Sequence, residues 1–205
     1  MRTATTWARR AGLALLAALL LAACANTRFT SQWKSPDYSG GPMRKVLVVG
    51  VSKQPSVRRT FEDEFVARLE AAGVDGIQSY TVLPDEALAD RAALEAAVKS
   101  TGADGVLVVR LVRREQQTQV VQASPAAPPT LGFYGWYSGA WSGYYEPATT
   151  YQYELVSLEA SLYSPAQANL VWSATTEGFA PTNLKKDSAS YADLIIDALR
   201  KDRIL

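Results

Sequence analysis

The chain has 205 residues, of which 20% are charged, with 21 Lys+Arg against 20 Asp+Glu and a formal net charge of +1. A nearly neutral chain offers no electrostatic reason to bind nucleic acid. The absence of histidine excludes the Ser-His-Asp and Cys-His arrangements of nucleophilic catalysis, and the single cysteine excludes a disulfide within the chain.

The N-terminal part has the layout of a bacterial export signal. Three arginines and no acid precede an uncharged run over residues 11–23. As a helix this run spans about 20 Å, too little for a bilayer core of roughly 30 Å. We therefore expect a secretory signal and not a membrane span. The four residues 21–24, Leu-Ala-Ala-Cys, resemble the lipobox of bacterial lipoproteins.

The lipobox resemblance implies a lipid anchor. Residues 1–23 would be removed as a signal peptide, and Cys24 would become the first residue, with a diacylglyceryl group on its sulfur and an acyl chain such as palmitate on its amino group. Several acyl chains give stable membrane attachment. Because Ala25 and not aspartate follows the cysteine, the resemblance implies the outer membrane of a Gram-negative cell, facing the periplasm. Loss of residues 1–23 lowers Lys+Arg from 21 to 18 against 20 Asp+Glu, a balance of −2.

The next segment, residues 25–43, is polar and rich in turn-forming residues. Together with Cys24 it is expected to form an acylated tether that lifts a domain off the membrane. Three aromatic side chains of this segment, Phe29, Trp33 and Tyr38, are able to dock onto that domain.

Residues 44–205 are expected to form one periplasmic domain, long enough for a hydrophobic core. Its first elements are predicted to be strands 45–52, 74–83 and 104–115, with helices from Pro55 to Gly73 and from Asp90 to Gly102. The first and third strands are continuous β-branched runs, typical of strands that are buried on both faces. Strand–helix–strand order predicts parallel pairing.

The second half of the domain has a different pattern. Residues 149–164 alternate apolar and polar side chains, and residues 169–178 follow after a turn that contains Pro165, which predicts an antiparallel hairpin. A last helix is expected at about residues 186–201. The chain is thus expected to be an α/β (α+β) protein with a single mixed five-stranded sheet, in the order βαβαβββα, and helices packed against the sheet.

A long segment, residues 122–148, separates the third and fourth predicted strands. Roughly 27 residues without secondary structure is typical of a functional or a disordered loop. Its middle alternates glycine or serine with aromatic residues, which are the candidate partner-binding residues Phe133, Tyr134, Trp136, Tyr137, Trp141, Tyr144 and Tyr145. Three interpretations stay open: the loop covers the sheet, recognises a protein or glycan, or dips into lipid. Its lack of Lys and Arg argues against lipid.

No stretch of the chain forms a complete catalytic, cofactor-binding or metal-binding motif. The first predicted strand ends at Gly50 without the glycines of a dinucleotide turn or a P-loop. Arg58 and Arg59 stand near a helix start and can meet an anion, but a solvated helix face is the simpler interpretation. Four acids of the same helix are also expected on its solvent side, namely Glu62, Asp63, Glu64 and Glu70.

Several segments resemble a family of small proteobacterial lipoproteins of unknown function. They are RKVLVVGVS (44–52), RRTFEDEFVARLEAAGV (58–74), GADGVLVVRLV (102–112) and LVWSATTE (170–177). The resemblance transfers no catalytic residue. We expect a non-catalytic, lipid-anchored binding or assembly module of the envelope, without a cofactor, whose partner is an envelope protein or peptidoglycan. The alternatives are a carboxylate-based enzyme acting on envelope polymers and an accessory subunit of a secretion or transport assembly.

Overall fold

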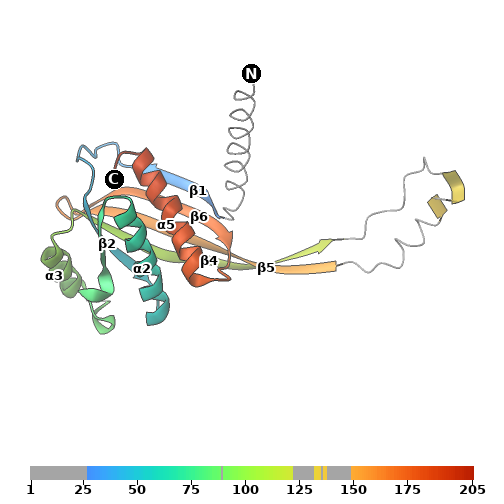
Figure 1. The fold of residues 1–205 in the computed structure, drawn as a ribbon, viewed down its shortest axis with the longest axis horizontal. Helices are drawn as coiled ribbons and strands as arrows, with labels where there is room; N and C mark the ends of the chain where they lie inside the picture. Colours follow the sequence, from blue (N-terminus) through green and yellow to red (C-terminus); the bar gives the residue numbers. More distant parts are fainter. Residues whose placement is uncertain (1–26, 89, 122–131, 135, 138–148) are drawn as a thin grey trace, which may run out of the picture.

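The fold is built on one mixed sheet with helices on both faces (Figure 1). The computed structural model describes residues 27–88, 90–121, 132–134, 136–137 and 149–205. Its elements are β1 (Thr27–Lys34), β2 (Lys45–Val51), α2 (Pro55–Ala71), β3 (Asp75–Gln78), two 3₁₀ turns (Ser79–Thr81 and Asp85–Ala87), α3 (Arg91–Thr101), β4 (Gly105–Val121), β5 (Thr149–Ser164), β6 (Asn169–Phe179) and α5 (Leu184–Lys201).

The sheet has six strands in the order β1-β6-β5-β4-β2-β3. Strand β2 is parallel to both β3 and β4, as the strand–helix–strand order predicts. Strands β4, β5, β6 and β1 follow in antiparallel pairs, and β5 and β6 form the expected hairpin. The α/β class with a mixed sheet is confirmed. The expected number of five strands is wrong, because β1 lies in the segment that was expected to be a tether.

Strand β1 is an edge strand made of mostly polar residues. It pairs with β6 from Thr27↔Gly178 to Lys34↔Trp172, with a bulge after Phe29. Six of its eight residues are exposed. The strand therefore needs no alternation of apolar and polar residues, and the sequence pattern does not reveal the strand. Phe29 packs against the core as a docked aromatic side chain, whereas Trp33 stays 46% exposed.

Helices α2 and α5 cover one face of the sheet, and the larger core lies beneath them (Figure 1). Phe65 and Leu69 of α2 and Ile195 of α5 are fully buried against Leu107 and Leu162 of the sheet. A smaller core around Leu47 and Val98 lies on the other face, at α3. Among the described helices, none is long and apolar enough to cross a bilayer.

The helix ends follow the predicted signals. Gly73 follows α2 with φ +80°, and Gly102 ends α3 with φ +63°, both in the left-handed region that glycine tolerates. The Asp90 side chain accepts hydrogen bonds from the backbone N–H groups of Ala92 and Ala93 at the start of α3. The predicted strand 74–83 is shorter than expected, because the chain turns into a 3₁₀ helix after Gln78.

The β4–β5 hairpin extends beyond the rest of the sheet (Figure 1). The last β5–β6 pair is Leu155↔Phe179, whereas the β4–β5 pairs continue to Val121↔Thr149. Residues 117–121 and 149–153 therefore form a two-stranded projection, here called the arm. At a rise of about 3.3 Å per residue it is roughly 16 Å long. A two-stranded hairpin without a covered face contributes little to stability.

Candidate functional site

The structure describes only part of the predicted site. Cys24, Trp141, Tyr144 and Tyr145 lie outside the described residues. The other four candidates are exposed: Phe133 by 67%, Tyr134 by 87%, Trp136 by 43% and Tyr137 by 49%.

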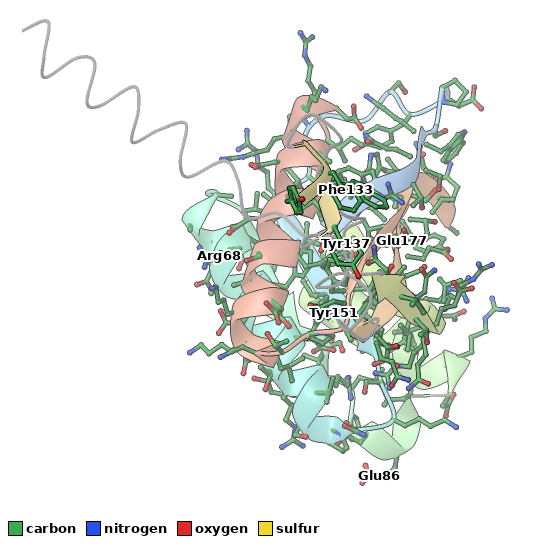
Figure 2. All side chains as sticks on the ribbon, turned by 90° about the vertical axis from the view of Figure 1, so that its right-hand side faces the viewer. Arg68, Glu86, Phe133, Tyr137, Tyr151 and Glu177 are labelled. Atoms are coloured by element: carbon green, nitrogen blue, oxygen red, sulfur yellow. The ribbon has the colours of Figure 1, made fainter. Side chains whose placement is uncertain are left out.

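Three of these exposed aromatic side chains lie together. The ring centroid of Phe133 is 5.3 Å from that of Tyr134 and 5.8 Å from that of Tyr137. Figure 2 shows Phe133 and Tyr137, with Tyr151 of the arm, on the side of the molecule from which the arm projects. The described aromatic residues thus form a small exposed cluster, as a recognition surface requires.

A second feature is a buried polar network at the carboxyl end of β2, which the sequence did not reveal. Arg58 and Glu62 of α2 are both 0% exposed. The expectation that they lie on the solvent side of the helix is wrong. Their spacing of four residues is the helical spacing of an ion pair, and this was the available signal.

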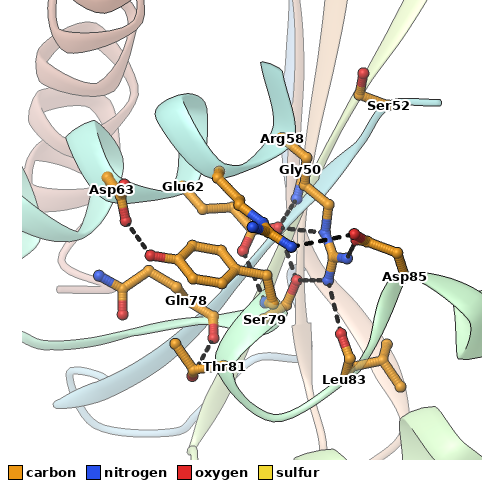
Figure 3. A network of polar contacts seen from close by, with 12 residues as sticks. Gly50, Ser52, Arg58, Glu62, Asp63, Gln78, Ser79, Thr81, Leu83 and Asp85 are labelled. Atoms are coloured by element: carbon orange, nitrogen blue, oxygen red, sulfur yellow. Dashed lines mark hydrogen bonds and ion pairs between the residues drawn. The ribbon is translucent and has the colours of Figure 1, made fainter. Parts of the chain in front are cut away.

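Glu62 is the centre of this network (Figure 3). Its Oε1 accepts hydrogen bonds from Arg58 Nε at 3.1 Å, Ser79 Oγ at 2.7 Å and the Gly50 backbone N–H at 2.9 Å. Its Oε2 accepts from the Tyr80 backbone N–H at 3.1 Å. Both oxygens are therefore occupied by donors from α2, β2 and the segment after β3, which indicates a structural role.

Arg58 is equally occupied. Its Nη1 donates to Asp85 Oδ1 at 2.6 Å, and its Nη2 donates to Ser79 Oγ at 2.7 Å and to the Leu83 carbonyl at 3.3 Å (Figure 3). A buried arginine that has two carboxylate partners, and whose three guanidinium nitrogens each donate a hydrogen bond, does not offer charge to a ligand. The network fixes the start of α2 on the sheet and holds the 79–85 segment against it.

The third feature is a cavity of about 680 Å³ beside this network. It lies between the first turns of α2 and α5 and the part of the sheet from which the arm leaves. Its apolar wall includes Val57, Phe61, Val109, Val156, Leu158 and Leu184. The volume lies within the roughly 300–1,000 Å³ of ligand pockets. The cavity is therefore the second candidate site.

The cavity lies at the end of the β6 face where the side chains are small compared with Trp172. Along β6, the alternate residues facing the helices are Trp172, Ala174, Thr176 and Gly178. Trp172 is fully buried and fills the space at one end, whereas Thr176 and Gly178 line the cavity at the other. Gly50, the residue before the last one of strand β2, also lines the cavity.

Tyr191 of α5 brings a buried polar group to the cavity. Its side chain lines the cavity and is only 5% exposed. Its hydroxyl forms no hydrogen bond with any described residue. Burial raises the pKa of Tyr191 well above its usual value, and the nearby Thr176 hydroxyl lowers it by a smaller amount. Thr176 itself donates to the Leu158 carbonyl at 3.3 Å. Its oxygen could still accept, but no hydrogen bond with acceptable geometry joins the two hydroxyls, and the phenol stays protonated.

These features define a small α/β protein that carries an apolar cavity and a projecting arm. Within the described ranges, no three acidic side chains converge as ligands for a metal ion. No protein-family model matches the chain, and no curated protein matches it significantly.

Solved structures of bacterial proteins resemble the fold. The PelC dodecamer from Paraburkholderia phytofirmans is 17% identical over 84% of this chain and 95% of that chain, with a TM-score of 0.42. Lipoprotein GNA1162 from Neisseria meningitidis is 14% identical over 77% and 96%, with a TM-score of 0.40. A minor lipoprotein from Acinetobacter baumannii is 11% identical over 78% and 94%, with a TM-score of 0.34. These likenesses concern the course of the chain and not its activity.

The buried network yields a stability prediction. Glu62→Ala is expected to lower the free energy of unfolding by about 3–5 kcal/mol, because it leaves Arg58, Ser79 and two backbone donors without their acceptor. The double variant Arg58→Met/Glu62→Leu is expected to lose less, since it removes both charges. Urea unfolding of the full chain measures both.

A matched control for this prediction is the exposed pair Arg91–Glu95, which has the same spacing. Glu95→Ala is expected to leave the unfolding midpoint unchanged. If Glu62→Ala were no more destabilising than Glu95→Ala, the structural role of the network would be refuted.

The unpaired phenol yields a second prediction. Tyr191→Phe is expected to raise the free energy of unfolding of the ligand-free protein by about 1–3 kcal/mol, because a buried donor without a partner is destabilising. Tyr163→Phe is the control, since Tyr163 is 40% exposed and is expected to show no change. A loss of stability in Tyr191→Phe would mean that the hydroxyl has a partner after all. Thermal unfolding of the three proteins distinguishes these results.

Proposed function

We propose that the chain is a lipid-anchored, non-catalytic binding module of the bacterial envelope. It stands at the outer membrane on the periplasmic side and recognises an envelope protein or peptidoglycan through the aromatic residues of the segment that joins the two strands of the arm. The observation that carries this proposal is the projection of two strands beyond the sheet, with exposed aromatic side chains in the segment that joins them.

The arm supports a recognition role because the core does not need it. Residues 111–120 of β4 are exposed throughout, and Val120 and Tyr151 are 58% and 56% exposed. Exposed apolar and aromatic side chains on an element outside the core are typical of a surface that a partner covers.

The contacts of the carboxylates near the cavity support a non-catalytic module and not a carboxylate-based enzyme. The Asp187 carboxylate, which lines the cavity, accepts from two backbone N–H groups. Two further carboxylates pair with arginines of the lining, Glu154 with Arg114 at 3.2 Å and Glu159 with Arg110 at 2.6 Å. Glu62 is enclosed by four donors. A glycosidase needs one carboxyl group as an acid and a second as a base or nucleophile, and these acids are committed to stabilising contacts.

Site-specific crosslinking tests the recognition surface. A photoreactive amino acid at Trp136 is expected to capture an envelope protein or a peptidoglycan fragment in cells, because this exposed position belongs to the segment that joins the two strands of the arm. The same amino acid at Tyr163, an exposed aromatic position on the body, is the matched control and is expected to capture neither. Mass spectrometry identifies the products.

Two outcomes contradict this proposal. Equal capture from positions 136 and 163 would show non-specific collision, and capture from neither would remove the recognition role. Deletion of residues 131–145 separates recognition from folding. The deleted protein is expected to unfold at the same temperature as the full chain and to lose capture.

The lipid anchor is tested by the mass of the N-terminal peptide. The membrane-bound protein is expected to start at Cys24, with a diacylglyceryl group on sulfur and an amide-linked acyl chain. Cys24→Ser is expected to retain residues 1–23 and to carry no lipid mass. A mature protein in the aqueous fraction, starting at another residue, would refute the anchor without bearing on the arm.

A further inference from the structure

The rim of the cavity is apolar and exposed, which favours an amphipathic ligand. Val51, Leu111 and Phe179 all line the cavity and are 58%, 48% and 51% exposed. Exposure of large apolar side chains to water at the entrance of an apolar cavity is unfavourable in free energy. An apolar ligand that covers these side chains removes this cost.

The Tyr191 hydroxyl indicates that the ligand carries an oxygen. A protonated phenol that is buried and unpaired in the cavity wall can donate one hydrogen bond. A purely hydrocarbon ligand would leave it unpaired, whereas an ester or carboxyl oxygen would accept that bond.

Positive charge at the entrance favours an anionic head group. Helix α2 starts beside the cavity without a side-chain cap and without an acid in its first turn, so its N-terminal N–H groups favour negative charge. Lys53 also lines the cavity and forms no ion pair with the described residues. The Asp187 carboxylate is the acid of the lining and is occupied by the backbone N–H groups of Thr182 and Asn183, each at 2.9 Å.

We propose that this cavity binds one acyl chain of an anionic glycerophospholipid. The acyl chain fills the apolar volume, its ester carbonyl accepts the hydrogen bond of Tyr191, and the phosphate lies at Lys53 and the start of α2. This site is separate from the aromatic arm and does not require the Cys24 anchor.

The acyl chains expected on Cys24 are the competing occupant. Thr27 lines the cavity and follows Cys24 by three residues, a reach of about 10 Å. The anchor group carries no phosphate, however, and would leave the charge at Lys53 unmatched. Charge complementarity therefore favours an exchangeable phospholipid from the membrane.

Photolabelling in vesicles tests the proposal with the full chain. The vesicles contain phosphatidylethanolamine and phosphatidylglycerol with a diazirine in one ester-linked acyl chain. After irradiation, label is expected on cavity-lining residues of β4, β5 and α5, located by peptide mass spectrometry. Labelling is expected to fall when phosphatidylcholine carries the same diazirine chain, because its head group has no net negative charge.

Two variants on α5 provide the matched comparison. Leu184→Trp places a large side chain at a position that lines the cavity, and it is expected to abolish labelling of the cavity residues. Lys186→Trp changes an exposed position outside the cavity and is expected to leave this labelling unchanged. If Leu184→Trp loses its near-ultraviolet circular dichroism, Val57→Trp on α2 replaces it. Equal labelling of the folded blocking variant and Lys186→Trp would overturn the proposal, as would label confined to other parts of the surface.

Tyr191→Phe tests the hydrogen bond itself. Labelling by the ester-linked lipid is expected to fall about two- to tenfold, while labelling by an ether-linked analogue is expected to stay unchanged. An equal response to both lipids would overturn the role of Tyr191.

A diazirine fatty acid fed to cells tests whether the acyl chains on Cys24 occupy the cavity. An intramolecular crosslink from Cys24 to a cavity residue would overturn an exchangeable lipid as the occupant.

Discussion

The buried ion pair between Arg58 and Glu62 is the interaction on which the rest of the architecture depends. One carboxylate joins helix α2, the end of strand β2 and the segment after β3, through contacts of 2.7 to 3.1 Å. A buried ion pair is stable only when all its polar atoms are satisfied. Because the polar atoms of this pair are satisfied, the pair fixes the start of α2 on the sheet, beside the cavity.

The cavity and the dense core are two ends of the same face of the sheet. At one end Trp172 and Leu162 are fully buried. At the other, Thr176 and Gly178 leave volume that the first turns of α2 and α5 do not fill. Close packing is the rule in protein interiors, and voids of this size are few in a domain. The contrast between Trp172 at one end of β6 and Gly178 at the other is thus a local feature of sequence that leaves a binding volume without disturbing the fold.

The sequence pattern predicted the strands that are buried on both faces of the sheet. It did not predict the exposed edge strand, the buried ion pair or the cavity. The apolar runs at 45–52 and 104–115 predicted β2 and the buried part of β4, because strands covered on both faces are mostly apolar. Strand β1 was missed because an edge strand with exposed side chains needs no apolar pattern. Glu62 was missed because a charged side chain on a helix indicates solvent unless its partners are known. The cavity was missed because its wall combines segments distant in sequence.

The cavity and the arm share strands and meet at one aromatic contact. Phe179 lies on the rim of the cavity, and its ring centroid is 5.4 Å from that of Tyr153 at the base of the arm. Arg114, which also lines the cavity, pairs with Glu154 next to Tyr153. A change at Phe179 therefore affects the rim of the cavity and the base of the arm, whereas Leu184 lines the cavity alone and Trp136 belongs to the segment joining the strands of the arm. This separation makes it possible to assign a loss of lipid labelling and a loss of partner capture to different parts of the molecule.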